Sequence, residues 1–139
     1  MDPEKDFLTW YDRALEHHKA GRFIEALADL NTALELAPND HACWFKRAIV
    51  HEDLKNIEQA VKDYTKCIEV FPSLDLVDKN SPNALLFYKG LLGNAYFNRG
   101  ILFIFDLNNK AAGKADWIKA IELGSEEAEA EMEKIKYNS

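Results

Sequence analysis

The sequence WYDRA at residues 10–14 returns as WFKRA at residues 44–48, 34 residues further along the chain. The match extends well beyond this motif. Positions 10, 13, 14, 17, 26, 29, 30, 33 and 38 fall on positions 44, 47, 48, 51, 60, 63, 64, 67 and 72. Chance does not keep so many positions in register, so the chain contains a 34-residue repeat.

Each repeat contains two amphipathic stretches, which in the first copy span residues 8–20 and 23–36. A short break joins them, Gly21-Arg22 in the first copy and Lys55-Asn56 in the second. Ala14 and Ala48 are small enough for a neighbouring helix to come close. Pro38 and Pro72 follow the second stretch and cannot continue a helix. The repeat therefore predicts stacked antiparallel helix hairpins and an all-α fold.

A third copy begins at YFNRG, residues 96–100, displaced by 18 additional residues. ADWIKAIEL, residues 115–123, then matches the second helix of repeat two, with one extra residue in the first helix. A rival alignment starts the repeat at LLGNAYFNRG, residues 91–100. The YFNRG alignment is preferred because it leaves only one extra residue within the repeat, whereas the rival alignment leaves eight.

The additional residues predict a loop at 73–81 and a first helix lengthened to about 82–107, with Ser81-Pro82 as its start. Ser125 can cap a last helix. The predicted organisation is one domain. Its parts are repeat one (7–40), repeat two (41–74), the insertion and lengthened helix (75–93), repeat three (94–125) and a capping helix (126–137).

This pattern resembles the tetratricopeptide repeat (TPR) family, although Ala14 and Ala48 stand where that family often has Gly. The resemblance implies a right-handed α-solenoid of three helix-turn-helix hairpins plus a C-terminal capping helix. It also implies a non-enzymatic scaffold or adaptor that binds a peptide or helical segment of a partner protein in a concave groove lined by the first helices. Carried over by position, the partner-binding groove contains Leu8, Tyr11, Leu15, His18, Phe45, Ile49, Glu52, Asn94, Phe97, Ile101 and Ile104.

The expected groove is largely apolar. Along each first helix an aromatic residue is followed one helical turn later by an aliphatic residue, so the aromatic residues form one level of the groove and the aliphatic residues form the next. It could take a partner segment, or it could be filled by the insertion, by the terminal helix or by a second copy in a homodimer. A small apolar ligand is a third alternative. Some family members clamp chaperone carboxylates with basic residues and Asn, but the corresponding positions here are Tyr11, Leu15, Lys46, Asn94 and Asn98. A chaperone partner of that kind is therefore not expected.

Other functional classes lack support in the sequence. The formal charge of −7 disfavours nucleic acid and anionic membranes as partners, since both need a basic face. His17, His18, His51 and the cysteines lack the spacing of a metal site. No nucleophile with a base, no glycine-rich phosphate loop and no cofactor motif is present, so neither enzymatic activity nor a cofactor is expected.

The cellular location is predicted from the cysteines and the N-terminus. Cys43 and Cys67 are isolated, and no basic stretch followed by an apolar run opens the chain. We expect a cytoplasmic protein. Arg13, Arg47 and Arg99 recur once per repeat and are interpreted as structural, each with its stem over a neighbouring helix and its head paired to an acidic residue.

Overall fold

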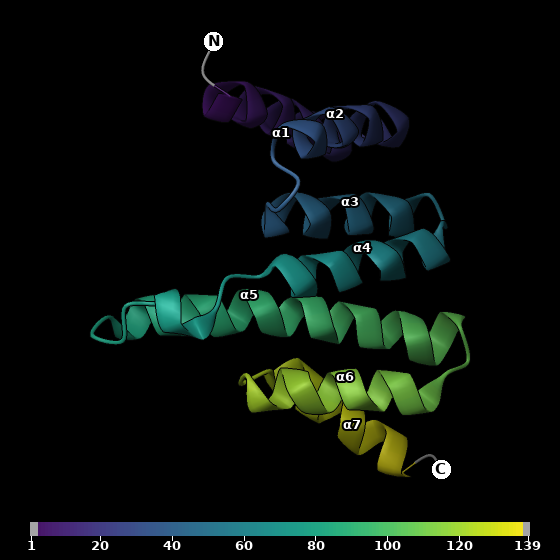
Figure 1. Ribbon diagram of the computed structural model, residues 1–139. Helices are drawn as coiled ribbons and strands as arrows, with labels where there is room; N and C mark the ends of the chain where they lie inside the picture. Colours follow the sequence, from purple (N-terminus) through teal and green to yellow (C-terminus); the bar gives the residue numbers. More distant parts are fainter. Residues whose placement is uncertain (1–2, 138–139) are drawn as a thin grey trace. The chain divides into compact units, whose positions relative to one another are not determined.

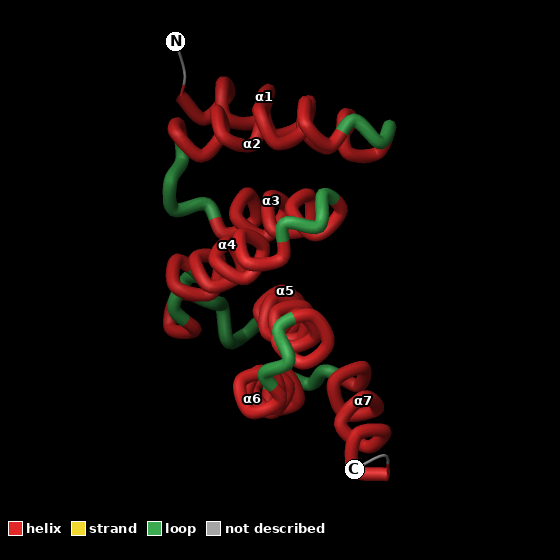
Figure 2. The backbone as a smooth tube through the Cα atoms, turned by 90° about the vertical axis from the view of Figure 1, so that its right-hand side faces the viewer, coloured by secondary structure: helices red, strands yellow, loops and turns green. Residues whose placement is uncertain are grey.

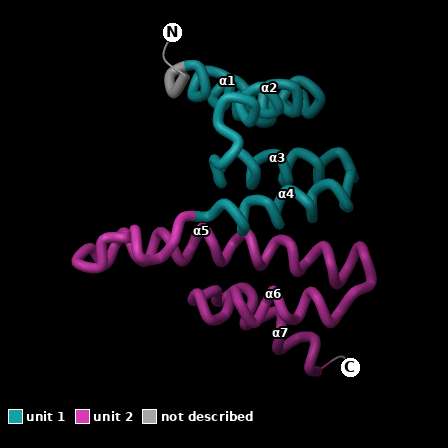
Figure 3. Tube along the Cα trace, viewed as in Figure 1, with its two compact units in different colours: residues 1–71 teal, residues 72–139 magenta. Residues whose placement is uncertain are grey.

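The computed structural model describes the backbone of residues 3–137 and the side chains of residues 6–137. Within these residues the ordered elements are helices, as Figures 1 and 2 show, so the predicted all-α class is confirmed. The chain divides into two compact units, residues 1–71 and residues 72–139 (Figure 3).

The first unit consists of two helix hairpins. Helix α1 (Pro3–Lys19) pairs with α2 (Phe23–Leu36), and α3 (His41–Asp53) pairs with α4 (Ile57–Val70). Fully buried alanines lie where helices cross, including Ala14 and Ala26 in the first hairpin. Because an alanine has only a methyl group, the backbones can approach closely at these positions, which is the role that the sequence predicted for Ala14 and Ala48.

The second unit contains a third hairpin and a terminal helix. A short 3-10 turn, η1 (Leu74–Leu76), precedes α5 (Pro82–Ile101), which continues into the π-helical turn η2 (Leu102–Asp106). Helix α6 (Lys110–Glu122) returns along α5, and α7 (Glu126–Tyr137) packs on α6. The Ser81 hydroxyl accepts the backbone N–H of Ala84, and Pro82 opens the helix, as the Ser-Pro pair predicts.

The hairpin turns share one backbone conformation. Gly21, Lys55 and Asn108 have φ values of 79°, 63° and 51°, in the left-handed region that ends a helix. Gly21 adopts this conformation without steric cost, and Asn tolerates it better than most residues. Lys55 does so in the second hairpin, where the backbone N–H of Asn56 donates to the carbonyl of His51.

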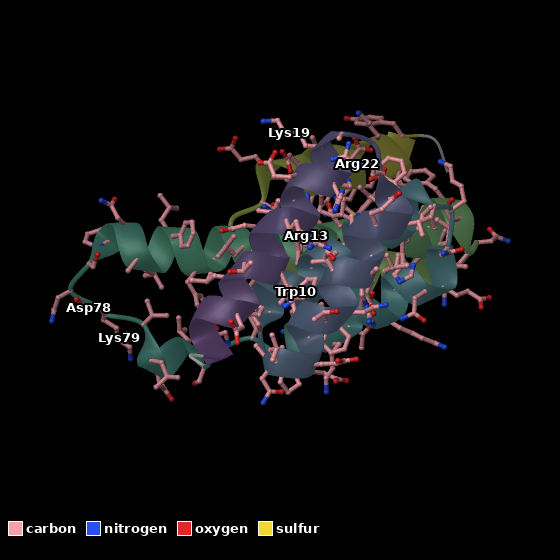
Figure 4. All side chains as sticks on the ribbon, turned by 90° about the horizontal axis from the view of Figure 1, so that it is seen from above. Trp10, Arg13, Lys19, Arg22, Asp78 and Lys79 are labelled. Carbon is pink, nitrogen blue, oxygen red and sulfur yellow. The ribbon has the colours of Figure 1, made fainter. Side chains whose placement is uncertain are left out.

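Each hairpin is fastened by one arginine that reaches a buried aspartate on the second helix. Arg13 donates from Nε to Asp29 at 2.8 Å, and Arg47 and Arg99 make the equivalent bonds to Asp63 and Asp116. The guanidinium carbon of Arg13 also lies 4.8 Å from the centre of the Trp10 ring, one turn earlier on α1 (Figure 4). The structural role predicted for these arginines is confirmed.

The third hairpin accommodates one extra residue. Arginine and aspartate are 16 residues apart in the first two hairpins and 17 apart in the third. The wider π-helical turn over Leu102–Asp106 absorbs the difference, because a π turn holds one residue more than an α turn. The Arg99–Asp116 pair therefore forms despite the longer spacing, as the YFNRG alignment requires.

Candidate functional site

The first unit has a hollow of about 620 Å³ at the end of its first helices. Two residues of the predicted groove, Leu15 and His18, line it from α1. Four further residues complete the lining: Lys19, Phe23, Lys46 and Asp53. The structure thus brings α1, the start of α2 and α3 together around one recess that combines apolar and charged groups.

Charges in this hollow are only partly compensated. His18 Nε2 lies 2.6 Å from the Asp53 carboxylate, so the ring and the carboxylate are hydrogen-bonded. Lys46 forms no ion pair with any residue that the structure describes. Burial lowers the pKa of Lys46, and the nearby Asp53 carboxylate opposes that effect. An ammonium group that has lost part of its hydration and has no direct partner can gain by binding an anion.

The aromatic level of the predicted groove is partly engaged in internal packing. Tyr11 stacks on Phe7 with ring centres 5.7 Å apart, and burial is the main cause that raises the pKa of Tyr11. Phe45 meets the edge of Tyr64 at 5.5 Å. Both groove aromatics are half-buried, so each offers one part of its ring to solvent.

The remaining groove residues of the first unit differ in exposure. Leu8 is exposed over 49% of its surface, whereas Ile49 is half-buried. The Glu52 carboxylate accepts a hydrogen bond from the Tyr64 hydroxyl, which ties α3 to α4. Glu52 therefore has a structural partner as well as a place on the predicted groove face.

In the second unit, Phe97 and Ile101 are half-buried against the core formed by Ile104, Trp117, Ala120 and Ala128. The ring of Phe97 stacks on Trp117 with centres 5.9 Å apart. Asn94 is exposed and lines a different hollow, between α5 and the start of α7. The structure therefore does not gather the three predicted residues around one recess.

Ile104 was expected in the groove, and that expectation is wrong. Its side chain is 7% exposed and belongs to the core of the second unit. The π turn spans Leu102–Asp106 and includes Ile104, so side chains in this stretch do not follow the α-helical spacing that placed Ile104 in the groove. The exposed position passes to Phe105, which is 64% exposed and whose ring centre lies 6.4 Å from that of Trp117.

The sequence prediction includes Leu15 and His18 but not the other lining residues, because it carries over only the groove positions of the repeat. In the sequence, Lys46 stands out only as one of the positions that correspond to a carboxylate clamp. A lysine directly after the groove aromatic Phe45 was the available signal. The contribution of Lys19, Phe23 and Asp53 depends on how the ends of α1 and α3 meet, which the repeat pattern does not specify.

No group of three or more His, Cys, Asp or Glu among residues 6–137 is placed to hold a metal ion. Burial raises the pKa of Cys43 and of Cys67 to about 12, so both are unreactive thiols. In the part of the chain that the structure describes, no helix is both long and apolar enough to cross a membrane.

Comparison with known families places this architecture. Two tetratricopeptide repeat models match the sequence, one over residues 7–40 and one over residues 41–74. The chain is a tetratricopeptide repeat protein. A search of curated protein sequences finds no match. The third TPR hairpin and its boundaries, residues 94–125, stay a prediction, which the Arg99–Asp116 pair supports.

Solved TPR structures share the fold at low sequence identity. The N-terminal domain of stress-induced protein-1 from C. elegans is 16% identical, with a TM-score of 0.81 and coverage of 98% of each chain. The Arabidopsis OM64 TPR domain is 17% identical, with a TM-score of 0.76, covering 99% of this chain and 100% of that one. The second TPR domain of human RPAP3, in complex with an HSP70 peptide, is 21% identical. Its TM-score is 0.73, covering 97% of this chain and 98% of that one.

Proposed function

We propose that this TPR protein is a non-enzymatic protein-interaction module that binds a peptide or helical segment of a partner along its first helices. The observation that carries the proposal is the hollow of the first unit. There the unpaired Lys46 ammonium adjoins the apolar side chains of Leu15 and Phe23. A ligand segment with an acidic side chain next to an apolar one would satisfy both features.

Relatives in the comparison support a peptide as the ligand. The human RPAP3 domain is described with the HSP70 peptide SGPTIEEVD, whose last residues are acidic and apolar. This chain offers a different set of groups for such a peptide. At the positions of the carboxylate clamp, Lys46 is the basic residue, and Asn94 and Asn98 stand in the third hairpin. We therefore expect an acidic side chain within the partner segment, rather than a chaperone C-terminus, to be recognised.

The two buried cysteines accord with a proposed cytoplasmic location. Cys43 and Cys67 are unpaired, and burial keeps both as thiols at neutral pH. A reducing compartment preserves such thiols.

Two capped dipeptides, leucine-glutamate and leucine-glutamine, test the charge preference directly. We expect the glutamate peptide to shift the backbone amide NMR signals of residues 15–23 and 46–53 at lower concentration than the glutamine peptide does. Lys46→Gln should reduce the ratio of the two peptide affinities to about one. Lys62→Gln, which removes an exposed lysine from α4, should leave this ratio unchanged. Equal binding of the two peptides by the unmodified protein would refute the charge preference.

The groove assignment is tested separately by Phe45→Glu, which places a charge on the half-buried aromatic level. If a partner segment lies along this face, a peptide that extends the leucine-glutamate pair by a further apolar residue should bind the Phe45→Glu protein more weakly than the unmodified protein. Circular dichroism serves as the control for folding. A folded Phe45→Glu protein with unchanged peptide affinity would place the binding surface elsewhere.

A further inference from the structure

The second unit exposes apolar side chains that hairpin packing does not explain. Leu76, Leu86 and Phe87 are exposed over 79%, 72% and 69% of their surfaces. They belong to the residues between the second and third repeats. The N-terminal part of α5 runs past the C-terminal end of α6 (Figure 1), so α6 leaves this part of the helix uncovered. An apolar helix face left open in this way is typical of an interaction surface.

Leu86 lies at the edge of a recess that continues one turn further along the same helix. Gly90 and Gly93 form part of the wall of a hollow of about 330 Å³, closed on its other side by Leu123 and the start of α7. A Cβ atom added at Gly90 would meet no atom within 4 Å, so the recess is open at this residue. The hollow is wide enough for a leucine or phenylalanine side chain. Its lining combines Leu86, Leu123 and glycines with polar and charged residues at the rim.

The projecting side chain and the recess lie on one face. Residues 86, 90 and 93 are spaced four and three apart, so they follow one another along a single side of a helix. Phe87 lies beside Leu86 at the edge of this face. A surface that carries both a projecting group and a matching recess is complementary to itself, as a two-fold symmetric interface requires.

Charge favours a second copy of the chain at this face. The protein has a net charge of −7, which opposes contact between two copies over most of their surfaces. Residues 72–93 contain Asp75, Asp78, Lys79 and Lys89, which sum to zero. Lys89, Glu126 and Glu127 border the recess, so a symmetric contact can bring the lysine of each copy close to a glutamate of the other.

We propose that the chain forms a homodimer through the N-terminal half of α5, with Leu86 and Phe87 of each copy packed over the Gly90 recess of the other. The two helices run antiparallel, because only that arrangement exchanges the two features about a two-fold axis. The contact involves the second unit and is independent of the hollow around Lys46, so either function can fail without the other.

Sedimentation velocity and light scattering test the dimer, with Gly90→Gln as the main variant. A Cβ atom at this position meets no atom within 4 Å, the longer glutamine side chain is expected to occupy the recess, and glutamine favours helix more than glycine does. We expect twice the 15.9 kDa chain mass for the unmodified protein at high micromolar concentration. Gly90→Gln, and separately Leu86→Gln with Phe87→Gln, should raise the dimer dissociation constant at least about tenfold while helix content is kept.

Ile24→Gln is the matched control, because Ile24 is 66% exposed on α2 in the first unit. It should leave the dimer unchanged. A monomer at every concentration, or a dimer that survives both sets of α5 variants, overturns the proposal. A monomer that sediments with phosphatidylcholine vesicles and loses this property in Leu86→Gln/Phe87→Gln also overturns it, since the exposed face would then bind lipid.

Discussion

A single buried carboxylate holds each hairpin together, and its arginine partner differs in exposure from one hairpin to the next. Asp29 and Asp63 have 5% and 1% of their side chains exposed. Arg13 is 58% exposed, whereas Arg47 is 18% exposed and also donates to Asn31 on α2. Water can therefore hydrate Arg13 when its carboxylate is removed, but it reaches Arg47 poorly.

This difference predicts unequal losses of stability. Asp63→Ala should lower the free energy of unfolding by about 3 kcal/mol, since it leaves a largely buried cation without its main partner. Asp29→Ala should cost about 1 kcal/mol, because Arg13 becomes an ordinary hydrated surface group. Urea unfolding followed by circular dichroism measures both values, with Lys62→Ala as the exposed control on α4. Equal losses for the two aspartates would contradict this account.

At the scale of the helix pair, α5 and α6 approach more closely than the other hairpins allow. A Cβ atom at Gly100 would lie 2.6 Å from Trp117 Cδ1, and one at Gly113 would lie 2.7 Å from the Gly100 carbonyl oxygen. The positions equivalent to Gly100 and Gly113 in the first hairpin are Ala14 and Ala26. The position equivalent to Trp117 is Leu30 there, so glycine compensates for the larger side chain.

The glycines of α5 and α6 should therefore respond oppositely to alanine. Gly113→Ala should destabilise the second unit by about 2–3 kcal/mol, because the backbone of α5 has to move away. Gly90→Ala should stabilise it by about 0.5–1 kcal/mol, since the methyl group meets no atom within 4 Å and alanine restricts the unfolded chain. Thermal unfolding of the two variants compares them, and a stabilised Gly113→Ala protein would refute the close approach.

The same helix shows where sequence reasoning succeeded and where it failed. The extra residue in the third repeat was visible from the alignment of Arg99 and Asp116, but its structural form was not. A π turn, an additional loop residue or a lengthened turn between the helices would each accommodate the one extra residue. Because the π turn Leu102–Asp106 includes Ile104, the form of this turn decides whether Ile104 or Phe105 faces solvent, and the sequence assignment of Ile104 is wrong for that reason.

For the molecule as a whole, the repeat made the fold predictable, because each recurring position performs one packing task in every hairpin. The arginines, the small residues and the hairpin turns follow directly from that recurrence. The candidate site was less predictable, since a hollow depends on how the ends of different helices meet. Leu15 and His18 follow from the repeat positions, whereas Asp53 enters through its hydrogen bond to His18 and Lys46 lines the same hollow from α3.

The histidines make the stability of the first unit depend on pH. Burial lowers the pKa of His41, which packs on Phe71 at 4.3 Å, and of His51, which lies 3.8 Å from Asp63. The Asp40 and Asp63 carboxylates oppose this effect and Arg47 adds to it at His51, but burial dominates at both residues. Each imidazole therefore binds a proton less readily in the folded chain than in the unfolded one.

The sign of the pH dependence follows from this difference. Above the ordinary histidine pKa of 6.5 both states hold neutral rings, so folding carries no penalty from these residues. As the pH falls below 6.5, the unfolded chain takes up protons first, and the free energy of unfolding decreases. Urea midpoints measured at steps between about pH 8 and pH 5, the range in which histidine titrates, should fall toward acid. His41→Gln together with His51→Gln should flatten this slope, and an unchanged slope in the double variant would show that other groups control it.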